Sequence, residues 1–305
     1  MCSAVACGSG SREHTPTSPA PTPPVAAVPD GPFIPGQSYF GRSNYIEYIA
    51  GNAPVIFTAP HGGTLTPSEI PERTCGIIAR DLETQELARK ISAVFHARTG
   101  KYPHVIINRL ARSRLDANRE IDEASCGNAA ARVAWQEWHA FIDIAKSSTV
   151  ASSGRGWLED LHGHGHAIQR LELGYLITKA ELDEPDSLLE SRETSSSVRQ
   201  LSIDDSSTTF AELIRGPESL GALFAAEGYP SIPSPTDTMP LGADYFNGGY
   251  NSRRHGCVDG GEICAIQVEA NRIGVRDSDE DVERFAEAVV KVTLEFLEDR
   301  WGLTI

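Results

Sequence analysis

The stretch Pro54-Val55-Ile56-Phe57-Thr58-Ala59-Pro60-His61-Gly62-Gly63 starts as a short apolar run and ends in a histidine followed by two glycines. A short apolar run bounded by turn residues predicts a strand buried in a sheet. The Gly-Gly pair predicts a tight turn directly after that strand. The sequence therefore predicts that a buried strand delivers His61 to the edge of a sheet.

Similar apolar runs recur along the chain and alternate with segments of helical spacing. We expect further strands at 104–108, 156–161, 171–177 and 263–269, and helices at 81–98, 128–146 and 279–300. The helical segments carry apolar residues three or four positions apart, as Val282, Phe285 and Val289 do. Such alternation indicates an α/β fold with a central mixed, mostly parallel sheet flanked by helices on both faces.

The first 35 residues differ in composition from the rest of the chain. They are rich in Pro, Ser and Thr and poor in large apolar residues, so we expect residues 1–35 to form a disordered tether before a single catalytic domain at 36–305. Small residues ending in Cys7 resemble the end of a lipoprotein signal, which predicts an extracytoplasmic protein with a lipid anchor at Cys7. The alternative is an ordinary terminus on a cytoplasmic protein.

The remaining cysteines agree with export to an oxidising compartment. Cys257 and Cys264 flank a Gly-Gly turn that could bring them within bridging distance, which would leave Cys75 and Cys126 to pair. Four buried free thiols are the alternative. The segment 181–209 is rich in Ser and acidic residues, and we expect it to form a surface excursion or lid.

The charge of the chain restricts its partners. With 42 acidic and 27 basic residues among 305, the net charge is -15 and no block of Lys or Arg occurs, so a nucleic-acid partner is not expected. An anionic substrate would be repelled at long range unless arginines reverse the sign of the charge locally.

Three polar segments follow predicted strands. The first holds His61, the second is Asp160-Leu161-His162-Gly163-His164-Gly165-His166, and the third contains Glu269. In an open α/β sheet, ligands bind beyond the carboxyl ends of the strands. Histidines and carboxylates that arrive on separate strands are what a catalytic zinc site needs: protein ligands, an open position, and a carboxylate as general base.

Four short motifs also follow one another in a distinctive order. They are Pro60-His61-Gly62-Gly63, Asp160-Leu161-His162, Gly249-Tyr250-Asn251-Ser252-Arg253-Arg254-His255-Gly256 and Gln267-Val268-Glu269-Ala270-Asn271-Arg272. In this order they resemble the N-formylglutamate amidohydrolase family over about residues 54–297. The resemblance implies a fold related to the zinc carboxypeptidases.

The resemblance also implies roles for individual residues. His61 and His162 match the family's zinc ligands, and Asp81 matches an acidic residue at the start of the following helix; Glu83, Glu69 and Glu72 are the alternatives for this third ligand. Glu269 matches the catalytic carboxylate, which would take a proton from water and pass it to the leaving nitrogen.

Further residues match positions that contact substrate. Asn118 and Arg119 resemble the Asn-Arg pair that grips a substrate carboxylate, and Arg253 and Arg254 lie in an arginine-bearing loop of the family. His164 and His166 depart from the family pattern. We expect them to contact substrate, to support the metal ligands, or to stabilise an oxyanion.

Together these observations predict a zinc-dependent amidohydrolase that cleaves an amide bond of an N-acyl acidic amino acid or a related carboxylate-bearing substrate. The departures around 160–166 favour an acyl group other than formyl. A carboxypeptidase-like metallopeptidase acting on peptide or cell-wall fragments is the alternative enzyme. A non-catalytic surface lipoprotein that binds metal or an acidic ligand is the alternative from another class.

Overall fold

The computed structural model describes Met1 and residues 28–305. Within this part of the chain, eight strands form one sheet in the order β1-β2-β4-β3-β5-β8-β6-β7. The strands are β1 (Ser38–Phe40), β2 (Ile46–Ile49), β3 (Val55–Ala59), β4 (His104–Asn108), β5 (Gly156–Gly163), β6 (Leu171–Gly174), β7 (Ser231–Ile232) and β8 (Ile263–Ala270).

The sheet is mixed, as the sequence predicts. The four central strands β4, β3, β5 and β8 are parallel, whereas β2 and β6 run antiparallel to their central neighbours β4 and β8. The expected strands at 54–59, 104–108, 156–161 and 263–269 are confirmed as β3, β4, β5 and β8. The strand expected at 171–177 is shorter, since β6 ends at Gly174, and the strands β1, β2 and β7 were not predicted.

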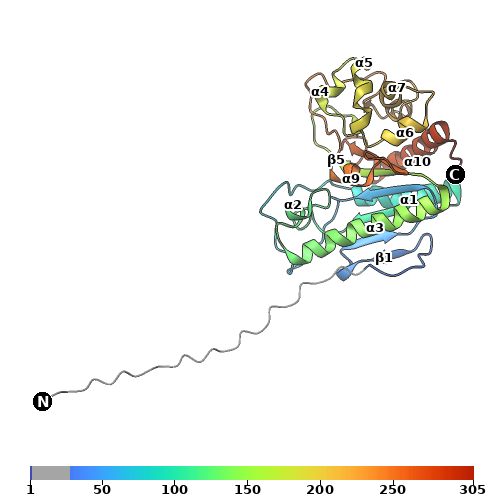
Figure 1. Cartoon of the computed structure of the whole chain (residues 1–305). Coiled ribbons are helices and arrows are strands. Elements are labelled where there is room, and N and C mark those ends of the chain that lie inside the picture. Colours follow the sequence, from blue (N-terminus) through green and yellow to red (C-terminus); the bar gives the residue numbers. More distant parts are fainter. Residues whose placement is uncertain (2–27) are drawn as a thin grey trace.

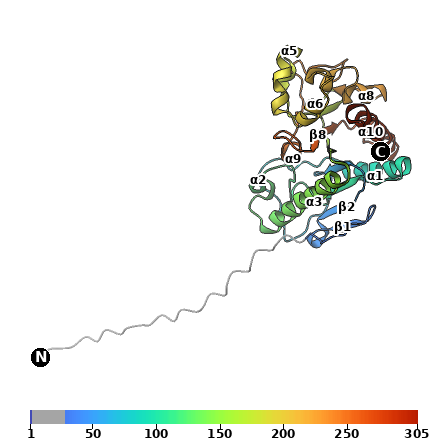
Figure 2. The ribbon, with the colours of Figure 1, turned by 45° about the vertical axis from the view of Figure 1, so that its right-hand side comes forward.

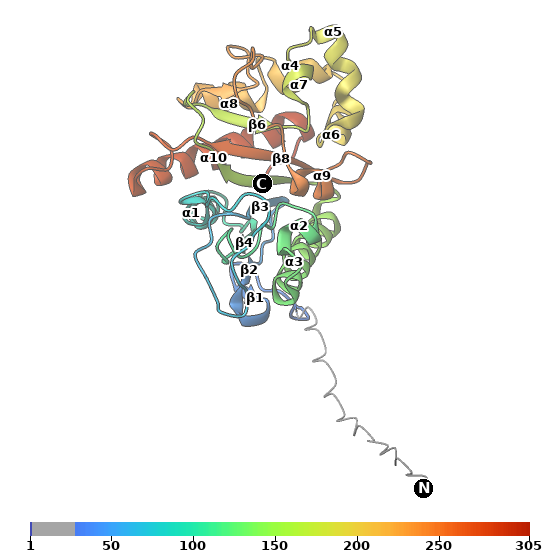
Figure 3. The same cartoon turned by 90° about the vertical axis from the view of Figure 1, so that its left-hand side faces the viewer.

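Helices cover both faces of this sheet (Figure 1). They are α1 (Thr84–Thr99), α2 (Ile121–Ser125), α3 (Ala129–Ser153), α4 (Lys179–Leu182), α5 (Asp186–Leu189), α6 (Arg199–Asp204), α7 (Phe210–Arg215), α8 (Leu220–Ala226), α9 (Tyr250–His255) and α10 (Asp279–Trp301), with short 3-10 helices at Arg42–Asn44 and Glu190–Ser195. Figure 3 shows α1 and α3 on opposite sides of the strands β2, β4 and β3.

Alternation along the strands builds a separate core on each face. Phe57 points into the core that contains α1 and α10, whereas its neighbour Ile56 points into the core that contains α3. Successive strand residues face opposite sides of a sheet, so a continuous apolar run is what a strand covered on both faces requires. This is why the stretch at 54–59 reads as uniformly apolar.

The segment 181–209, expected to form a surface excursion or lid, is packed onto the core. Leu182, Leu189, Val198 and Leu201 from this segment are fully buried in the same core as α1 and α10. The helices α4 to α8 lie at the end of the molecule away from β1 (Figures 1 and 2). Buried leucines spaced among serines and acidic residues anchor this region, which the overall polarity of the segment conceals.

Ordered packing begins before the expected domain boundary at residue 36. The Phe33 ring lies 4.9 Å from the ring of Tyr39 and 5.4 Å from that of Tyr48, and Val28 packs against the same core. The rest of the expected tether, with Cys7, lies outside the described residues. No helix in the part of the chain that the structure covers is long and apolar enough to cross a membrane.

Two disulfides join the four cysteines of the folded part of the chain. Cys257 pairs with Cys264 across seven residues, and Cys75 pairs with Cys126 across 51. Both pairings agree with the expected ones. The second ties the long loop between β3 and α1 to the C-terminal end of α2.

The order of the strands creates a crevice at one edge of the sheet. From β3 the chain passes through α1 on one face to β4, then through α3 on the other face to β5, which lies on the opposite side of β3 from β4. The direction of winding therefore reverses at β3. A ligand-binding crevice forms beyond the carboxyl ends of the strands at such a point, between β3 and β5.

One acidic side chain lies inside the core, away from this crevice. Glu159 of β5 is fully buried and accepts hydrogen bonds from the Thr293 hydroxyl at 2.7 Å and the Trp157 indole N–H at 2.9 Å, both on Oε1. Its Oε2 has no hydrogen-bond partner among the described residues. Burial raises the pKa of Glu159 to about 7, because the ionised form loses its hydration.

We expect Glu159 to make the stability of the protein depend on pH. The pKa of the Glu159 carboxyl is higher in the folded state than in the unfolded state. Its contribution to the free energy of unfolding is therefore fully present below about pH 4.5 and is lost as the pH rises through about 7. Glu159→Gln should match the wild type at pH 5 and exceed it at pH 8 by up to about 3 kcal/mol in the free energy of unfolding. Urea unfolding at both pH values measures this, and a difference that does not change with pH would contradict it.

Candidate metal centre

Three neighbouring parallel strands each bring one polar side chain to the crevice. His61 follows β3 by two residues, His162 lies near the end of β5, and Glu269 lies near the end of β8, directly opposite His162 in the register of the two strands. All three side chains are buried. The sequence-based prediction that these strand-end residues meet at one edge of the sheet agrees with this arrangement.

The position of His61 depends on the close approach of its turn to the segment after β4. The N–H groups of Thr64 and Leu65 both donate to the Arg109 carbonyl, and Gly63 pairs with Ala111. A Cβ atom on Gly63 would lie 2.0 Å from the Leu110 carbonyl oxygen. Only glycine permits this approach, which fixes the backbone that directly follows His61.

Asp81 completes a compact cluster with the two histidines. Its Oδ2 lies 3.2 Å from His61 Nδ1 and 3.1 Å from His162 Nδ1, and the two Nδ1 atoms are 3.1 Å apart. Donor atoms about 2.0–2.1 Å from a tetrahedral zinc ion lie about 3.3 Å from one another. The triangle therefore has nearly the dimensions of one face of a zinc coordination sphere.

Two further carboxylates determine which nitrogen of each histidine is free. His61 Nε2 donates to Asp116 Oδ1 at 2.6 Å, and His162 Nε2 donates to Asp160 Oδ2 at 2.8 Å. The hydrogen-bond network thus assigns the proton of each neutral imidazole to Nε2. A carboxylate that fixes the outer nitrogen of a metal-ligating histidine is the usual support for such a ligand.

The consequence is that both Nδ1 lone pairs of His61 and His162 point toward the same small space. Two lone pairs and a carboxylate oxygen at this distance repel one another unless a cation lies between them, either a proton on one nitrogen or a metal ion. The two-nitrogen, one-oxygen donor set is a common protein set for zinc. These residues therefore fit a divalent metal ion.

The electrostatics of the cluster favour bound positive charge. Burial by itself would lower the pKa of His162, but Asp160, Asp81 and Glu269 raise it well above its ordinary value. Burial by itself would raise the pKa of the Asp81 carboxyl, yet the two histidines hold that pKa well below its usual range. The carboxylates that stabilise a proton on His162 would stabilise a metal ion in the same place.

Arg112 holds two of these carboxylates in position. Its Nε donates to Asp116 Oδ2 at 3.0 Å, and its Nη1 donates to Asp81 Oδ1 at 3.4 Å and to the Ala79 carbonyl. Asp81 itself lies outside the helix that the sequence predicts to begin there. The helix starts only at Thr84, because Glu83 adopts a left-handed backbone with φ of 65°. The ligand is therefore carried by a loop that Arg112 orients.

Glu269 lies beside the three candidate ligands His61, Asp81 and His162 and is not part of that group. Its Oε1 is 3.9 Å from His162 Nδ1 and accepts a hydrogen bond from Gln267 Nε2 at 2.9 Å. Burial raises its pKa to about 7, and the neighbouring Asp81 adds to this shift. A carboxyl group with a pKa near neutrality is suited to accept and return a proton.

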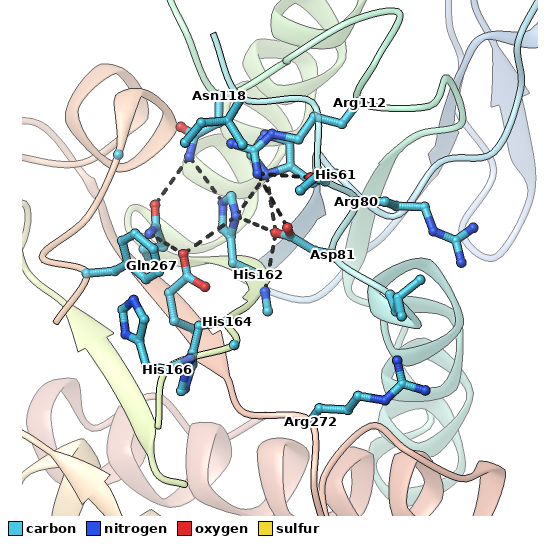
Figure 4. A pocket seen from close by; sticks show the side chains of 18 of the residues that line it. His61, Arg80, Asp81, Arg112, Asn118, His162, His164, His166, Gln267 and Arg272 are labelled. Atoms are coloured by element: carbon cyan, nitrogen blue, oxygen red, sulfur yellow. Dashed lines mark hydrogen bonds and ion pairs between the residues drawn. The ribbon is translucent and has the colours of Figure 1, made fainter. Parts of the chain in front are cut away.

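A pocket of about 480 Å³ opens over the cluster (Figure 4). Its walls come from the loop before α1, the segment before α2, the ends of β5 and β8, and the segment before α9. The volume lies within the range of about 300–1,000 Å³ that is usual for small-molecule sites. His61, Asp81, His162 and Glu269 lie among its lining residues.

The predicted substrate-binding residues divide into two groups. Asn118 and Arg119 line the pocket, whereas the exposed Arg253 and Arg254 of α9 do not belong to its lining. Arg254 instead lies over the ring of Trp135. The register of α9 turns Asn251 inward, where it donates to Asp160, so the two arginines face away from the site.

Asn118 supports the site more than it offers free groups to a ligand. Its side-chain oxygen accepts the N–H of Asn251 at 2.7 Å, and its amide nitrogen lies 3.2 Å from both Gln267 Oε1 and His162 Nε2. Arg119 is half-buried; its Nη1 donates to the Asn118 carbonyl and its Nε pairs with Glu123. Within residues 28–305, the second terminal nitrogen of Arg119 has no hydrogen-bond partner.

His164 and His166 line the same pocket but form a different cluster. His164 Nε2 donates to the Arg170 carbonyl and its Nδ1 accepts the N–H of His166, so both of its nitrogens are used. His166 Nδ1 bonds to Glu172 at 2.8 Å, and its ring stacks on Phe246. With Glu172 this group has the composition of a metal site, but either nitrogen of His164 would have to give up its hydrogen bond to serve as a ligand.

The alternatives for the third ligand do not join the metal centre. Glu69 bonds to Tyr45 and pairs with Arg42, Glu72 is exposed, and Glu83 is absent from the pocket lining and the candidate metal cluster found among the described residues.

The supporting residues Asp116, Asp160, Arg112 and Gln267 were not among the site residues predicted from the sequence. Asp160 gave one local signal, because it precedes His162 by two positions and therefore shares its face of the strand. Asp116 gave none, since it lies 55 positions from the histidine that it holds.

Comparison with known proteins supports the fold. No protein-family model and no curated protein matches the sequence. The structure is similar to that of N-formylglutamate amidohydrolase from Ralstonia eutropha, with a TM-score of 0.52 and 13% identity over 85% of this chain and 99% of that one. It is also similar to a gene product of Agrobacterium tumefaciens, with a TM-score of 0.51 and 12% identity over 84% of this chain and 95% of that one. The predicted fold class is thus confirmed, and the resemblance to the family holds at the level of the fold.

The two histidine clusters have separate hydrogen-bond networks, and we expect only the cluster of His61 and His162 to contribute to zinc binding. We expect the purified protein to bind zinc, His162→Ala to weaken binding at least about 100-fold, and Asp116→Asn to weaken it about 10- to 100-fold through loss of ligand support. His166→Ala, a histidine of the same pocket, is the matched control and should bind zinc as the wild type does.

Competition with a chromogenic chelator measures these affinities. Zinc affinity that is unchanged in His162→Ala, or lost in His166→Ala, would show that the ion binds elsewhere.

Proposed function

We propose that this protein is a zinc-dependent hydrolase that cleaves the amide bond of a small, carboxylate-bearing N-acyl amino acid. The observation that carries the proposal is the buried triangle of His61, Asp81 and His162, whose free donor atoms converge beside the carboxyl group of Glu269. The overall fold, shared with an N-formylglutamate amidohydrolase, agrees with this reaction class.

His61, Asp81 and His162 would hold the zinc ion. When bound, zinc supplies Lewis acidity: it polarises the amide carbonyl and makes a water molecule acidic enough to attack near neutral pH. Asp116 and Asp160 keep the two imidazoles in the tautomer that leaves Nδ1 free. Neutral imidazole and carboxylate ligands leave part of the positive charge available to the substrate.

Glu269 would move the protons of the reaction. Its carboxylate takes a proton from the attacking water and returns it to the leaving nitrogen, so the amide C–N bond breaks to give a carboxylate and a free amine. Burial keeps the pKa of Glu269 near 7, which suits both directions of transfer. Gln267 holds one oxygen of Glu269 and thereby orients the other.

Arg119 would bind a carboxylate of the substrate. Arg119 lines the pocket wall formed by the segment before α2, and a guanidinium group gives both charge and directed hydrogen bonds to a carboxylate. The pocket volume of about 480 Å³ supports a small substrate over an extended peptide. The proposal therefore favours an amidohydrolase over the carboxypeptidase-like alternative.

We also propose that the protein works outside the cytoplasm. The two disulfides support this location, because disulfides persist mainly in oxidising compartments. Anchoring through an acylated Cys7 would agree with it. Mass spectrometry of the N-terminus of the mature protein tests the anchor.

Removing the proton-transfer group should separate catalysis from metal binding. Glu269→Gln keeps the size of the side chain and its bond to Gln267 but cannot accept a proton, so kcat should fall by about 100- to 10,000-fold while zinc content is unchanged. Free amine released from a panel of N-acyl amino acids measures the activity. Glu159→Gln, a buried strand carboxylate on the other face of β5, is the matched control and should keep wild-type kcat.

Chelation should abolish activity, and zinc should restore it. Zinc-loaded wild-type protein that hydrolyses no amide in the panel would instead favour the non-catalytic alternative. Glu269→Gln protein with full activity would exclude the assigned proton-transfer role.

A further inference from the structure

The charge of the pocket is opposite to that of the whole chain. The chain carries a net charge of -15, yet five arginines line the pocket together with only two carboxylates, those of Asp81 and Glu269. The arginines are Arg80, Arg112, Arg119, Arg272 and Arg276. A local excess of positive charge in an acidic protein indicates selection for an anionic ligand.

Two of these arginines are buried and already committed to the protein. Arg112 bonds to Asp81 and Asp116, as described above. Arg276 donates to the backbone carbonyls of Ala270 and Leu82, and its guanidinium group packs under Gly163, where a Cβ atom would collide with it. Arg276 therefore joins the end of β8 to the loop that carries Asp81.

Arg80 and Arg272 differ from these two. Both are exposed, and within residues 28–305 neither guanidinium group has a hydrogen-bond or ion-pair partner. Arg80 directly precedes Asp81, whose N–H donates to the His61 carbonyl, and Arg272 follows β8 by two residues, with its carbonyl accepting the N–H of Arg276. Two unpaired guanidinium groups on anchored backbone are available to a ligand.

The two groups lie on one side of the centre. In Figure 4, Arg80 and Arg272 extend along the side of the pocket opposite Asn118 and Gln267, with His61, Asp81 and His162 between the two sides. The Nη1 atom of Arg119 donates to the Asn118 carbonyl at 2.9 Å, which places this guanidinium group beside Asn118. The pocket thus offers one guanidinium group on one side of the candidate zinc position and two on the other.

We propose that Arg80 and Arg272 form a second anion subsite, so that the substrate carries a carboxylate on each side of the amide bond that is cleaved. This inference rests on the proposed function. The substrate class is an N-acyl amino acid whose acyl group ends in a carboxylate. Arg119 binds the carboxylate on one side of the amide, and Arg80 and Arg272 bind the carboxylate on the other.

The reaction balances without any co-reactant. Water adds to the acyl carbon, the C–N bond breaks, the nitrogen leaves as the amine of an amino acid, and the acyl group leaves as a dicarboxylate. Together the products carry one carboxylate and one ammonium group more than the substrate. A positively charged pocket lowers the free energy of the extra carboxylate as it forms.

A matched substrate pair tests the subsite. N-succinyl-L-alanine and N-butyryl-L-alanine differ only in the terminal carboxylate, which is a methyl group in the second. We expect kcat/KM to be at least about 100-fold higher for the succinyl compound, mostly through KM, because two charge-assisted contacts are lost with the methyl group. Arg80→Gln and Arg272→Gln should each reduce this preference about tenfold. Arg254→Gln, an exposed arginine outside the pocket, should leave it unchanged.

Binding separates failure of the subsite from failure of the proposed function. Calorimetric titration of the Glu269→Gln protein with both compounds should show the same preference in Kd, and Arg80→Gln in that background should reduce it. Equal affinities would overturn the subsite even if amides are hydrolysed. Preferential succinyl binding without hydrolysis by the wild type would retain the subsite and overturn the proposed function.

Discussion

The structure of the candidate site depends on two nitrogen lone pairs that face each other. His61 Nδ1 and His162 Nδ1 are 3.1 Å apart, and carboxylates fix the proton of each ring on the opposite nitrogen. This arrangement is unfavourable by itself and becomes favourable only around a cation. The surrounding carboxylates, the burial of the cluster and the position of Glu269 all follow from the need to hold positive charge at one point. The chemistry that we propose uses that same point.

The fold provides this geometry through the reversal of winding at β3. Because β4 and β5 lie on opposite sides of β3, the segments that leave these strands separate and open a crevice. Gly63 lets the turn after β3 press against the segment after β4, and Arg276 closes the side toward α1. The binding site is therefore a product of topology and of two close backbone approaches. Side chains alone would not assemble it.

The sequence predicts the part of this site that is carried by regular structure. His61, His162 and Glu269 can be placed because each ends an apolar strand, and parallel strands end at one edge of a sheet. Asp81 could be predicted only through the family resemblance, because the loop that carries it has no hydrophobic periodicity. Asp116 supports a histidine 55 positions away, and no local pattern encodes such a contact. The assignment of Arg253 and Arg254 to substrate binding has no support from the structure, because the direction in which a short helix turns its side chains depends on packing that the sequence does not show.

The disulfide between Cys75 and Cys126 gives the metal centre a link to the redox state of its surroundings. Asp81 lies on the stretch between β3 and α1, which has no helix or strand of its own, and this bond ties that stretch to the end of α2. Closing a 51-residue separation removes chain entropy before any ion arrives. In the oxidised protein the disulfide thus supplies part of the ordering of the loop that binding of an ion at Asp81 would otherwise require.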